Sequence, residues 1–156
     1  MLFDRLIIDG YNLLHQTDDL APLMRTDIQS ARHRLVRMVE EAAHYMARQT
    51  TIVFDGREAG IDPALSSSYL EVFFSPSDLS ADSVIERIVC RSENPGKILV
   101  VTSDRAEHDT VSSAGAHTMS CGDFMNRCRA HAKKQRPRRT PPGKEPRLGD
   151  LFPDDL

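Results

Sequence analysis

The chain has 156 residues, of which 40% are apolar and 28% are charged, as is typical of a single soluble globular domain. No apolar run approaches the length of about 18 residues that a membrane-spanning helix needs, and Asp4 and Arg5 interrupt the stretch that a secretory signal would keep apolar. The net charge is −3, and the three cysteines, an odd number without C-x-x-C spacing, favour reduced thiols in a cytoplasmic protein over disulfides or a zinc site.

The first elements expected along the chain are a buried strand and a long helix. Leu6–Ile8 is an apolar run that leads into Asp9, and the following GYN is typical of an immediate turn. Asp27 is expected to cap a helix that reaches about Gln49, because apolar residues recur there with a period near 3.6. The chain therefore begins with the order strand, turn, helix.

Strands and helices continue to alternate in the rest of the chain. Thr51–Phe54 is rich in β-branched residues and, like the first strand, is followed by an aspartate, Asp55. The remaining expected elements are a loop over 57–68, a strand over Leu70–Phe74, a helix over Ala81–Arg91 capped by Ser80, a strand over Ile98–Val101, a helix from about Arg105 that stops at Gly115, a strand over His117–Met119 and a helix from about Gly122 to Lys133. This alternation predicts an α/β fold with a mainly parallel sheet of about five strands, covered by helices on both faces.

The end of the chain differs from the rest in charge. Residues 1–126 carry a net charge of −8, whereas nine basic and four acidic residues from Arg127 onward give +5. Residues 134–156 contain five prolines and few apolar residues, so we expect a folded domain over 1–133 followed by a disordered tail. Such a segment is either a polyanion-binding tail or a solvated end, and the basic residues expected to contact RNA in the first case are Lys133, Lys134, Arg136, Arg138 and Arg139.

Aspartates follow three of the predicted strands. Asp9, Asp55 and Asp104 should converge, because ligands of an open parallel sheet bind outside the carboxyl ends of its strands. Asp82, in the first turn of a helix, can reach the same edge. Carboxylates brought together repel one another, and a divalent cation with a preference for oxygen ligands, Mg²⁺ or Mn²⁺, removes that cost.

Each of these residues also has a purely structural interpretation. A single aspartate after a strand is commonly a turn former, and Asp82 can simply favour the helix dipole. Asn12 either caps or closes its turn, or it holds Asp9 or a metal-bound water. Ser103 bonds to a carboxylate, a phosphate or the backbone. Arg105 either contacts an RNA backbone or forms a surface ion pair.

Several other hydrolytic and nucleotide-binding chemistries lack their motifs. The sequence contains no G-x-x-x-x-G-K-[ST] phosphate loop, no G-x-G-x-x-G after a strand and no G-x-S-x-G nucleophile elbow. A phosphatase with an aspartyl nucleophile would need a second acid two residues after Asp9, where this chain has Tyr11.

The segments IIDGYNLLH, VFDG, SADSVIERIV, VVTSDR and GAHTMSCGDF, in this order and spacing, resemble the NYN domain family, and in particular its bacterial YacP-like branch, which is related to PIN-domain nucleases. The resemblance covers roughly residues 3–130. It implies a PIN-like, Rossmann-like three-layer α/β/α fold and Mg²⁺- or Mn²⁺-dependent endoribonuclease activity. One activity characterised in the YacP-like branch is the cleavage of mRNA in association with the ribosome.

The resemblance also assigns residues to the site. It places Asp9, Asn12, Asp55, Asp82 and Asp104 in the acidic centre, with Asp9, Asn12, Asp82 and Asp104 as catalytic residues and the four aspartates as metal ligands.

The sequence departs from the family at two places. Around Asp82, relatives often have an acid directly after this position, where this chain has Ser83, and an acidic or threonine approach before it, where this chain has Leu79-Ser80. The basic tail lies outside the family pattern. Two alternatives to an endoribonuclease therefore stay open: a non-catalytic RNA-binding module with a degenerate site, and a small-molecule phosphohydrolase on a similar sheet.

Overall fold

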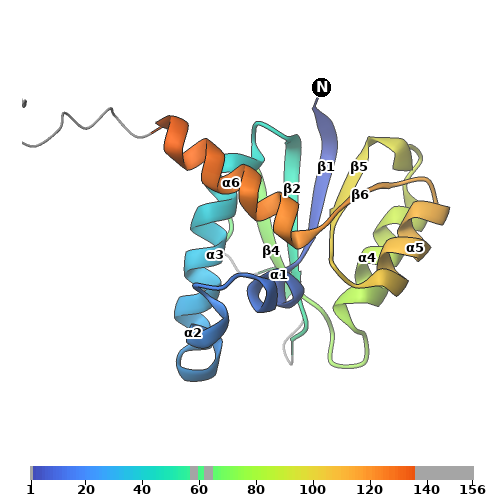
Figure 1. Ribbon diagram of the computed structural model, residues 1–156. Coiled ribbons are helices and arrows are strands. Elements are labelled where there is room, and N and C mark those ends of the chain that lie inside the picture. Colours follow the sequence, from blue (N-terminus) through green and yellow to red (C-terminus); the bar gives the residue numbers. More distant parts are fainter. Residues whose placement is uncertain (1, 57–59, 62–64, 136–156) are drawn as a thin grey trace, which may run out of the picture.

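A computed structural model of the protein (Figure 1) describes residues 2–56, 60–61 and 65–135. Its elements in chain order are β1 (Phe3–Asp9), α1 (Gly10–Gln16), α2 (Ala21–Thr26), α3 (Ile28–Ala43), β2 (Ala47–Phe54), β3 (Gly60–Ile61), β4 (Leu70–Phe74), α4 (Ala81–Arg91), a 3₁₀ turn η1 (Pro95–Lys97), β5 (Ile98–Val101), α5 (Arg105–Ser113), β6 (His117–Met119) and α6 (Cys121–Gln135). Among these helices, none has both the length and the apolar character required to cross a membrane.

The sheet has the strand order β3-β4-β2-β1-β5-β6. Five neighbouring strands, β4-β2-β1-β5-β6, are parallel, which confirms the predicted α/β sheet. The short β3 pairs antiparallel with β4 at one edge, within the segment 57–68 that was expected to be loop. The central strand β1 pairs with β2 on one side and with β5 on the other, so its carboxyl end lies in the middle of the sheet edge.

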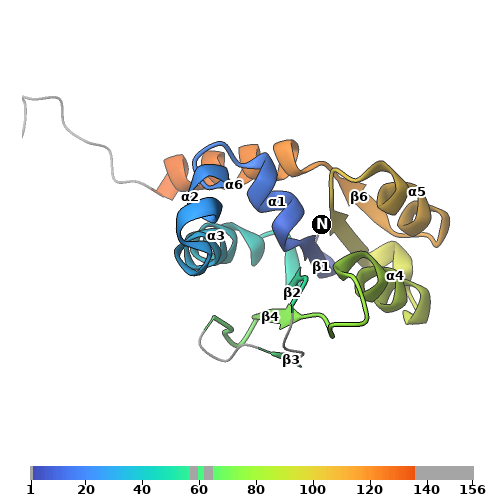
Figure 2. The same ribbon diagram turned by 90° about the horizontal axis from the view of Figure 1, so that it is seen from below.

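Helices cover both faces of the sheet, which confirms the predicted three-layer α/β/α arrangement (Figures 1 and 2). Helices α1, α2, α3 and α6 lie on one face, and α4 and α5 lie on the other. The side chains of β1 alternate between the two cores: Leu6 and Ile8 pack under the first set of helices, and Ile7 packs under the second. Because side chains alternate along a strand, Asp9 is on the same side as Ile7 and faces α4 and α5.

Asp9 ends β1 and also starts a helix, which corrects the turn expected at GYN. Its side chain accepts a hydrogen bond from the backbone N–H of Asn12 and caps α1, which begins at Gly10. An ideal Cβ atom at Gly10 would lie 2.3 Å from the ring of Phe54. The absence of a side chain at this position therefore lets α1 begin directly against the sheet.

The long helix is shorter than the sequence predicts. Asp27 caps α3 as expected and accepts from the N–H of Ser30, but α3 ends at Ala43 instead of near Gln49. The residues from Ala47 onward belong to β2, where they pair with β1. Pairing with the central strand outweighs the helical pattern of this segment, a tertiary effect that local periodicity does not contain.

The second half of the chain agrees closely with the prediction. Ser80 caps α4 over the expected range, β4, β5 and β6 have the expected bounds, and α5 is followed by Gly115, whose φ is +104°. Helix α6 begins one residue before Gly122 and continues to Gln135. The predicted tail is outside the described residues from 136 onward.

Candidate active site

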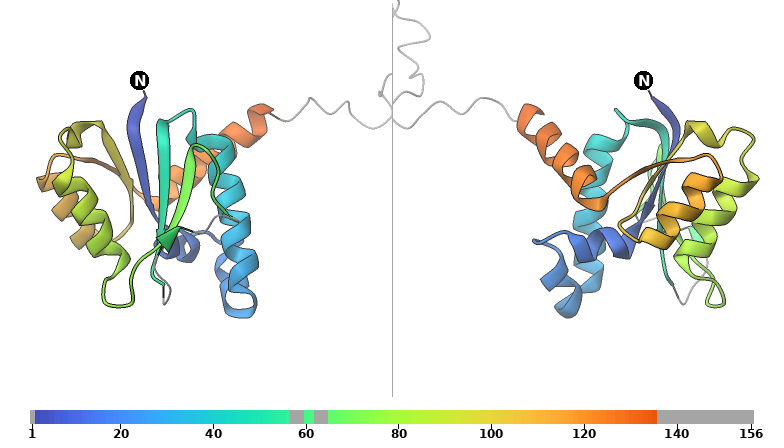
Figure 3. Two further views of the ribbon diagram at one scale, coloured as in Figure 1. Left: turned by 180° about the vertical axis from the view of Figure 1, so that it is seen from behind. Right: turned by 45° about the vertical axis from the view of Figure 1, so that its right-hand side comes forward.

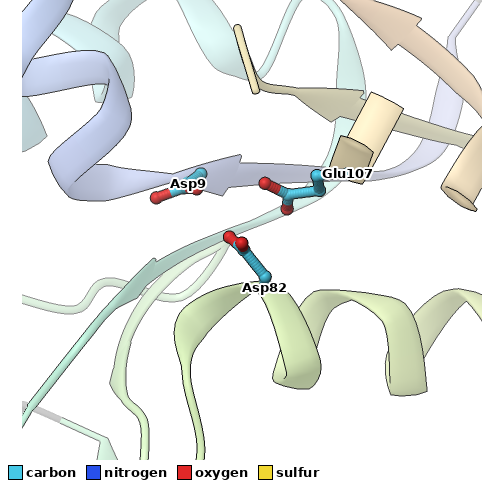
Figure 4. A group of neighbouring side chains, drawn as sticks. All are labelled: Asp9, Asp82 and Glu107. Carbon is cyan, nitrogen blue, oxygen red and sulfur yellow. The ribbon is translucent and has the colours of Figure 1, made fainter. Parts of the chain in front are cut away.

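Three carboxylates converge at the carboxyl edge of the sheet (Figure 4). They are Asp9 at the end of β1, Asp82 in the first turn of α4 and Glu107 in the first turn of α5, and one oxygen of each lies within 4.8 Å of the others. Asp9 and Asp82 were predicted for this site, whereas Glu107 was not. The two other predicted ligands, Asp55 and Asp104, are not part of this carboxylate cluster.

Asp55 holds the start of the helix that carries Asp82. Its Oδ1 accepts a hydrogen bond of 2.6 Å from the backbone N–H of Ala81 and is 3.5 Å from the hydroxyl of Ser75. Ser80 caps the same helix through the N–H of Ser83 at 3.1 Å. Asp55 and Ser80 together therefore fix where α4 begins and hence the position of Asp82.

Asp104 has the corresponding position in front of Glu107. It caps α5, with Oδ1 accepting from the N–H groups of Ala106 at 2.9 Å and of Glu107 at 3.2 Å. Thr102, at the end of β5, donates from Oγ1 to Glu107 Oε2 at 3.0 Å and accepts from the N–H of Asp104 at 3.1 Å. The cap and the threonine direct the Glu107 side chain inward, to the carboxylate cluster.

In the sequence, Glu107 has the position of the glutamate in a helix-capping motif. D-R-A-E over residues 104–107 has an N-cap residue followed three positions later by a glutamate, which is the spacing of a capping box. In a capping box the glutamate bonds back to the N-cap N–H, but here that N–H bonds to Thr102. The sequence does show a glutamate in a helix that is expected to cover the sheet. It does not show which way that helix is turned, so Glu107 could not be assigned to the site.

Burial makes the Asp9 and Glu107 side chains difficult to ionise. Asp9 is 7% exposed and Glu107 is 1% exposed. Burial, and secondarily the neighbouring Asp82 carboxylate, raises the pKa of Asp9 to about 6. Burial, followed by repulsion from Asp9 and Asp82, raises the pKa of Glu107 to about 9.

The carboxylate cluster fits a divalent cation. Glu107 Oε1 is buried and has no hydrogen-bond partner among the described residues, which is costly for a polar atom. The ion pairs found in the described ranges, Arg48–Asp4 and His108–Asp109, do not involve these three carboxylates. Three oxygen donors without a cationic side chain form the kind of ligand set that Mg²⁺ and Mn²⁺ prefer.

Asn12 joins three segments beside Asp9. Its Oδ1 accepts from the N–H of Ser103 at 2.7 Å and from the thiol of Cys121 at 3.2 Å. The hydroxyl of Ser103 in turn accepts from the N–H of Cys121 at 3.0 Å, at the start of α6. These two predicted site residues thus hold α1, the end of β5 and α6 together at the switch point between β1 and β5.

The predicted RNA contacts occupy two different places. Arg105 is exposed at the start of α5 and lines an open groove of about 720 Å³ together with Ser103 and His108. Lys133 and Lys134 are exposed in the last turn of α6. The remaining predicted contacts, Arg136, Arg138 and Arg139, are outside the described residues.

Comparisons with known proteins agree with this geometry. A family model, the YacP-like NYN domain, matches residues 6–149 and thus extends past residue 130 into the basic segment, where the resemblance was expected to end. The uncharacterized protein YacP of Bacillus subtilis (strain 168) is 27% identical over 124 residues, which are 78% of this chain and 73% of that protein.

The fold is similar to that of solved structures. A crystal structure of Rae1 (YacP) from Bacillus subtilis has a TM-score of 0.71 and 25% identity, covering 84% of this chain and 76% of that chain. A crystal structure of a single-residue mutant of the same protein has a TM-score of 0.70 and 23% identity, covering 84% and 78% of the two chains.

Proposed function

Since the family match extends over nearly the whole chain, the protein belongs to the YacP-like NYN domain family, and from this premise we propose that it is a metal-dependent endoribonuclease. Membership supports a nuclease-type, RNA-related function in general. The observation that carries the specific proposal is the convergence of Asp9, Asp82 and Glu107, with Glu107 Oε1 buried and unpartnered.

In this proposal the three carboxylates of the cluster hold Mg²⁺ or Mn²⁺. When bound, the cation supplies charge compensation to the scissile phosphate and lowers the pKa of the attacking water. Asp9 and Glu107 enter from the buried side of the site, and the half-buried Asp82 lies nearer to solvent. These three residues would hold the cation, with Asp82 on the side nearer to solvent.

The other predicted site residues act through the backbone in this proposal. Asp55 positions α4 and hence Asp82, and Asp104 positions α5 and hence Glu107. Asn12 keeps α1 in register with the end of β5. We therefore assign Asp55, Asp104 and Asn12 to positioning, in place of the ligand and catalytic roles that the family resemblance implies.

The RNA would approach along the groove beside α5. Arg105 offers positive charge there, although Asp104, Asp109 and Asp123 also line the groove. We propose mRNA as the substrate class, the ribosome as its setting and the cytoplasm as the compartment. The support for these three assignments is family membership and the basic segment from Lys133 onward.

The test is cleavage of an end-labelled single-stranded RNA with Mg²⁺, with Mn²⁺ and with EDTA. We expect cleavage only with a divalent cation and its loss in Asp9→Asn, because asparagine keeps the shape but not the charge of the ligand. Glu86→Gln, on α4 and outside the carboxylate cluster, is the matched control and should cleave normally. Equal cleavage by Asp9→Asn and the wild type, with circular dichroism showing both folded, would contradict the proposal.

A non-catalytic RNA-binding module is the second candidate, and Ser83 is the feature that favours it. Its N–H and hydroxyl both bond to Ser80, so this position supplies a helix cap instead of another carboxylate. RNA binding without cleavage under any cation would favour this module. Hydrolysis of p-nitrophenyl phosphate without RNA cleavage would instead favour a small-molecule phosphohydrolase.

A further inference from the structure

Four rings form a contiguous cluster away from the carboxylates. His44 and Tyr45 follow the end of α3, Tyr69 precedes β4, and His131 is on α6. The centroid of Tyr45 is 4.0 Å from that of His44 and 4.5 Å from that of His131, and His44 is 5.8 Å from Tyr69. We refer to these four residues as the ring cluster.

The ring cluster lies at the opposite edge of the sheet from the carboxylates. Tyr69 is next to the first residue of β4, and the carbonyl of Met46, beside Tyr45, accepts from the N–H of Phe3 at the start of β1. Figures 1 and 3 show the end of α3 and the second half of α6 side by side at this edge. Because α3 has 16 residues, its two ends are about 24 Å apart.

Packing of the protein interior does not explain the ring cluster. None of its four residues belongs to either hydrophobic core, and Tyr45 is 57% exposed. Tyr69 is 36% exposed. Two aromatic rings thus remain accessible in a protein whose other described tyrosine, Tyr11, packs against Phe54.

The ring cluster is cationic on the side formed by α6, whereas Glu40 and Glu41 precede His44 on α3. Residues 124–134 of α6 contain no Asp or Glu, and they present exposed basic side chains on either side of His131, namely Arg127, Arg129, Lys133 and Lys134. The ring cluster and this stretch of α6 together combine accessible rings with exposed basic side chains, of which Arg127 and Lys134 are on the same helix face as His131. Single-stranded nucleic acid has the complementary combination, because its bases stack on aromatic rings and its phosphates bind cations.

We infer that the ring cluster is a second RNA-binding surface, on which a base of single-stranded RNA stacks against Tyr45 while α6 neutralises the adjoining phosphates. This inference rests on the proposed function only in taking RNA as the substrate. A strand that reaches both the ring cluster and the carboxylates must span most of the length of α3. The contribution of Tyr45 should therefore appear with long RNA and disappear with fragments of a few nucleotides.

Fluorescence reports the stacking directly. The chain has no tryptophan, so Tyr45→Trp places a single indole in the ring cluster. We expect a 20-nucleotide oligoadenylate to quench this fluorescence saturably in EDTA, where the RNA stays intact. Unchanged fluorescence at concentrations that saturate binding would overturn the inference and leave the ring cluster as a surface for a protein partner.

Measurements of RNA affinity distinguish stacking on the Tyr45 ring from simple apolar contact with its side chain. Tyr45→Phe should bind the 20-nucleotide RNA like the wild type, whereas Tyr45→Leu, which keeps an apolar side chain without a π face, should bind roughly 5- to 100-fold more weakly. Ile28→Ala, at an exposed apolar position at the other end of α3, is the control and should not change affinity. Equal affinity of Tyr45→Leu and the wild type would overturn the inference.

The two proposals fail in different ways. Tyr45→Leu should cleave a tetranucleotide at the wild-type rate, since so short a substrate does not reach the ring cluster. Loss of cleavage in Asp9→Asn together with unchanged binding in Tyr45→Leu would overturn the second surface alone. Absence of any RNA binding by the wild-type protein would overturn both proposals.

Discussion

Glu107→Gln should stabilise the protein in the absence of divalent cations while removing its response to them. The folded protein raises the pKa of Glu107 from 4.5 to about 9, so at neutral pH this side chain keeps a proton that the unfolded chain releases. Each pH unit between these values costs about 1.4 kcal/mol of stability. At pH 7 the cost is about 3 kcal/mol, and it falls to about 1 kcal/mol or less at pH 5.

The sign follows from proton binding. Because the folded state binds the Glu107 proton more tightly than the unfolded state does, this contribution to stability is largest below pH 4.5 and is lost as the pH rises toward 9. Glutamine has nearly the same shape and no proton to release. The variant should therefore approach the wild type at pH 4.5 and gain up to about 3 kcal/mol on it at pH 7 in EDTA.

Urea unfolding followed by circular dichroism measures this effect across pH 5 to 8, first in EDTA and then with saturating Mg²⁺ or Mn²⁺. The cation should stabilise the wild type by about 3 kcal/mol at 100 times its dissociation constant, and the variant by much less. Glu41→Gln, at an exposed position on α3, controls for the loss of a charge and should leave stability unchanged within about 0.5 kcal/mol. A variant that is destabilised at pH 7, or that differs from the wild type equally at pH 5 and pH 7, would refute the argument.

Asp104→Asn should retain most RNA cleavage because asparagine also caps helices. Asp104→Ala should lose cleavage together with about 1 kcal/mol of stability. Loss of cleavage in the asparagine variant would identify Asp104 as a cation ligand. Asn12→Ala should cost about 1 kcal/mol in urea unfolding because the N–H of Ser103 loses its acceptor, and unchanged stability would contradict this role of Asn12. Deletion of residues 135–156 should weaken RNA or ribosome binding and flatten its dependence on salt while leaving the cleavage position unchanged, as titrations at several salt concentrations would show; an unchanged salt slope would identify the tail as a solvated end.

The parallel sheet was predictable because the apolar strands of this chain are short, continuous and well separated by helical segments. The α4 helix was predictable in its bounds because Ser80 caps it locally. The start of α1 was not, since Asp9-Gly10 is a turn signal in isolation and becomes a helix start only where Gly10 packs against the ring of Phe54. The same limit applies to the end of α3, where pairing with β1 replaces the helix.

The sequence predicted where the candidate site lies better than it predicted which residues form it. The end of a strand can be recognised in the local sequence as an apolar run followed by a polar residue. The position of Asp9 at the carboxyl edge of the sheet could therefore be inferred. Whether an aspartate after a strand belongs to the cluster depends on tertiary placement: Asp9 caps α1 and is in the cluster, whereas Asp55 and Asp104 accept from helix-start N–H groups and are outside it. Glu107 was missed because its inward direction depends on Thr102, five residues earlier, and on the placement of α5 over the sheet.

The central position of β1 determines when the carboxylate cluster can be completed during synthesis of the chain. Asp9 is made early, but the strand that bears it gains its second neighbour, β5, only after three other strands have been made. The last carboxylate of the cluster, Glu107, arrives later still, with α5. A nascent chain therefore carries one carboxylate of the cluster until Asp82 is made and two until Glu107 is made. If the protein cleaves RNA as proposed, it does so only after α5 has been synthesised and has folded.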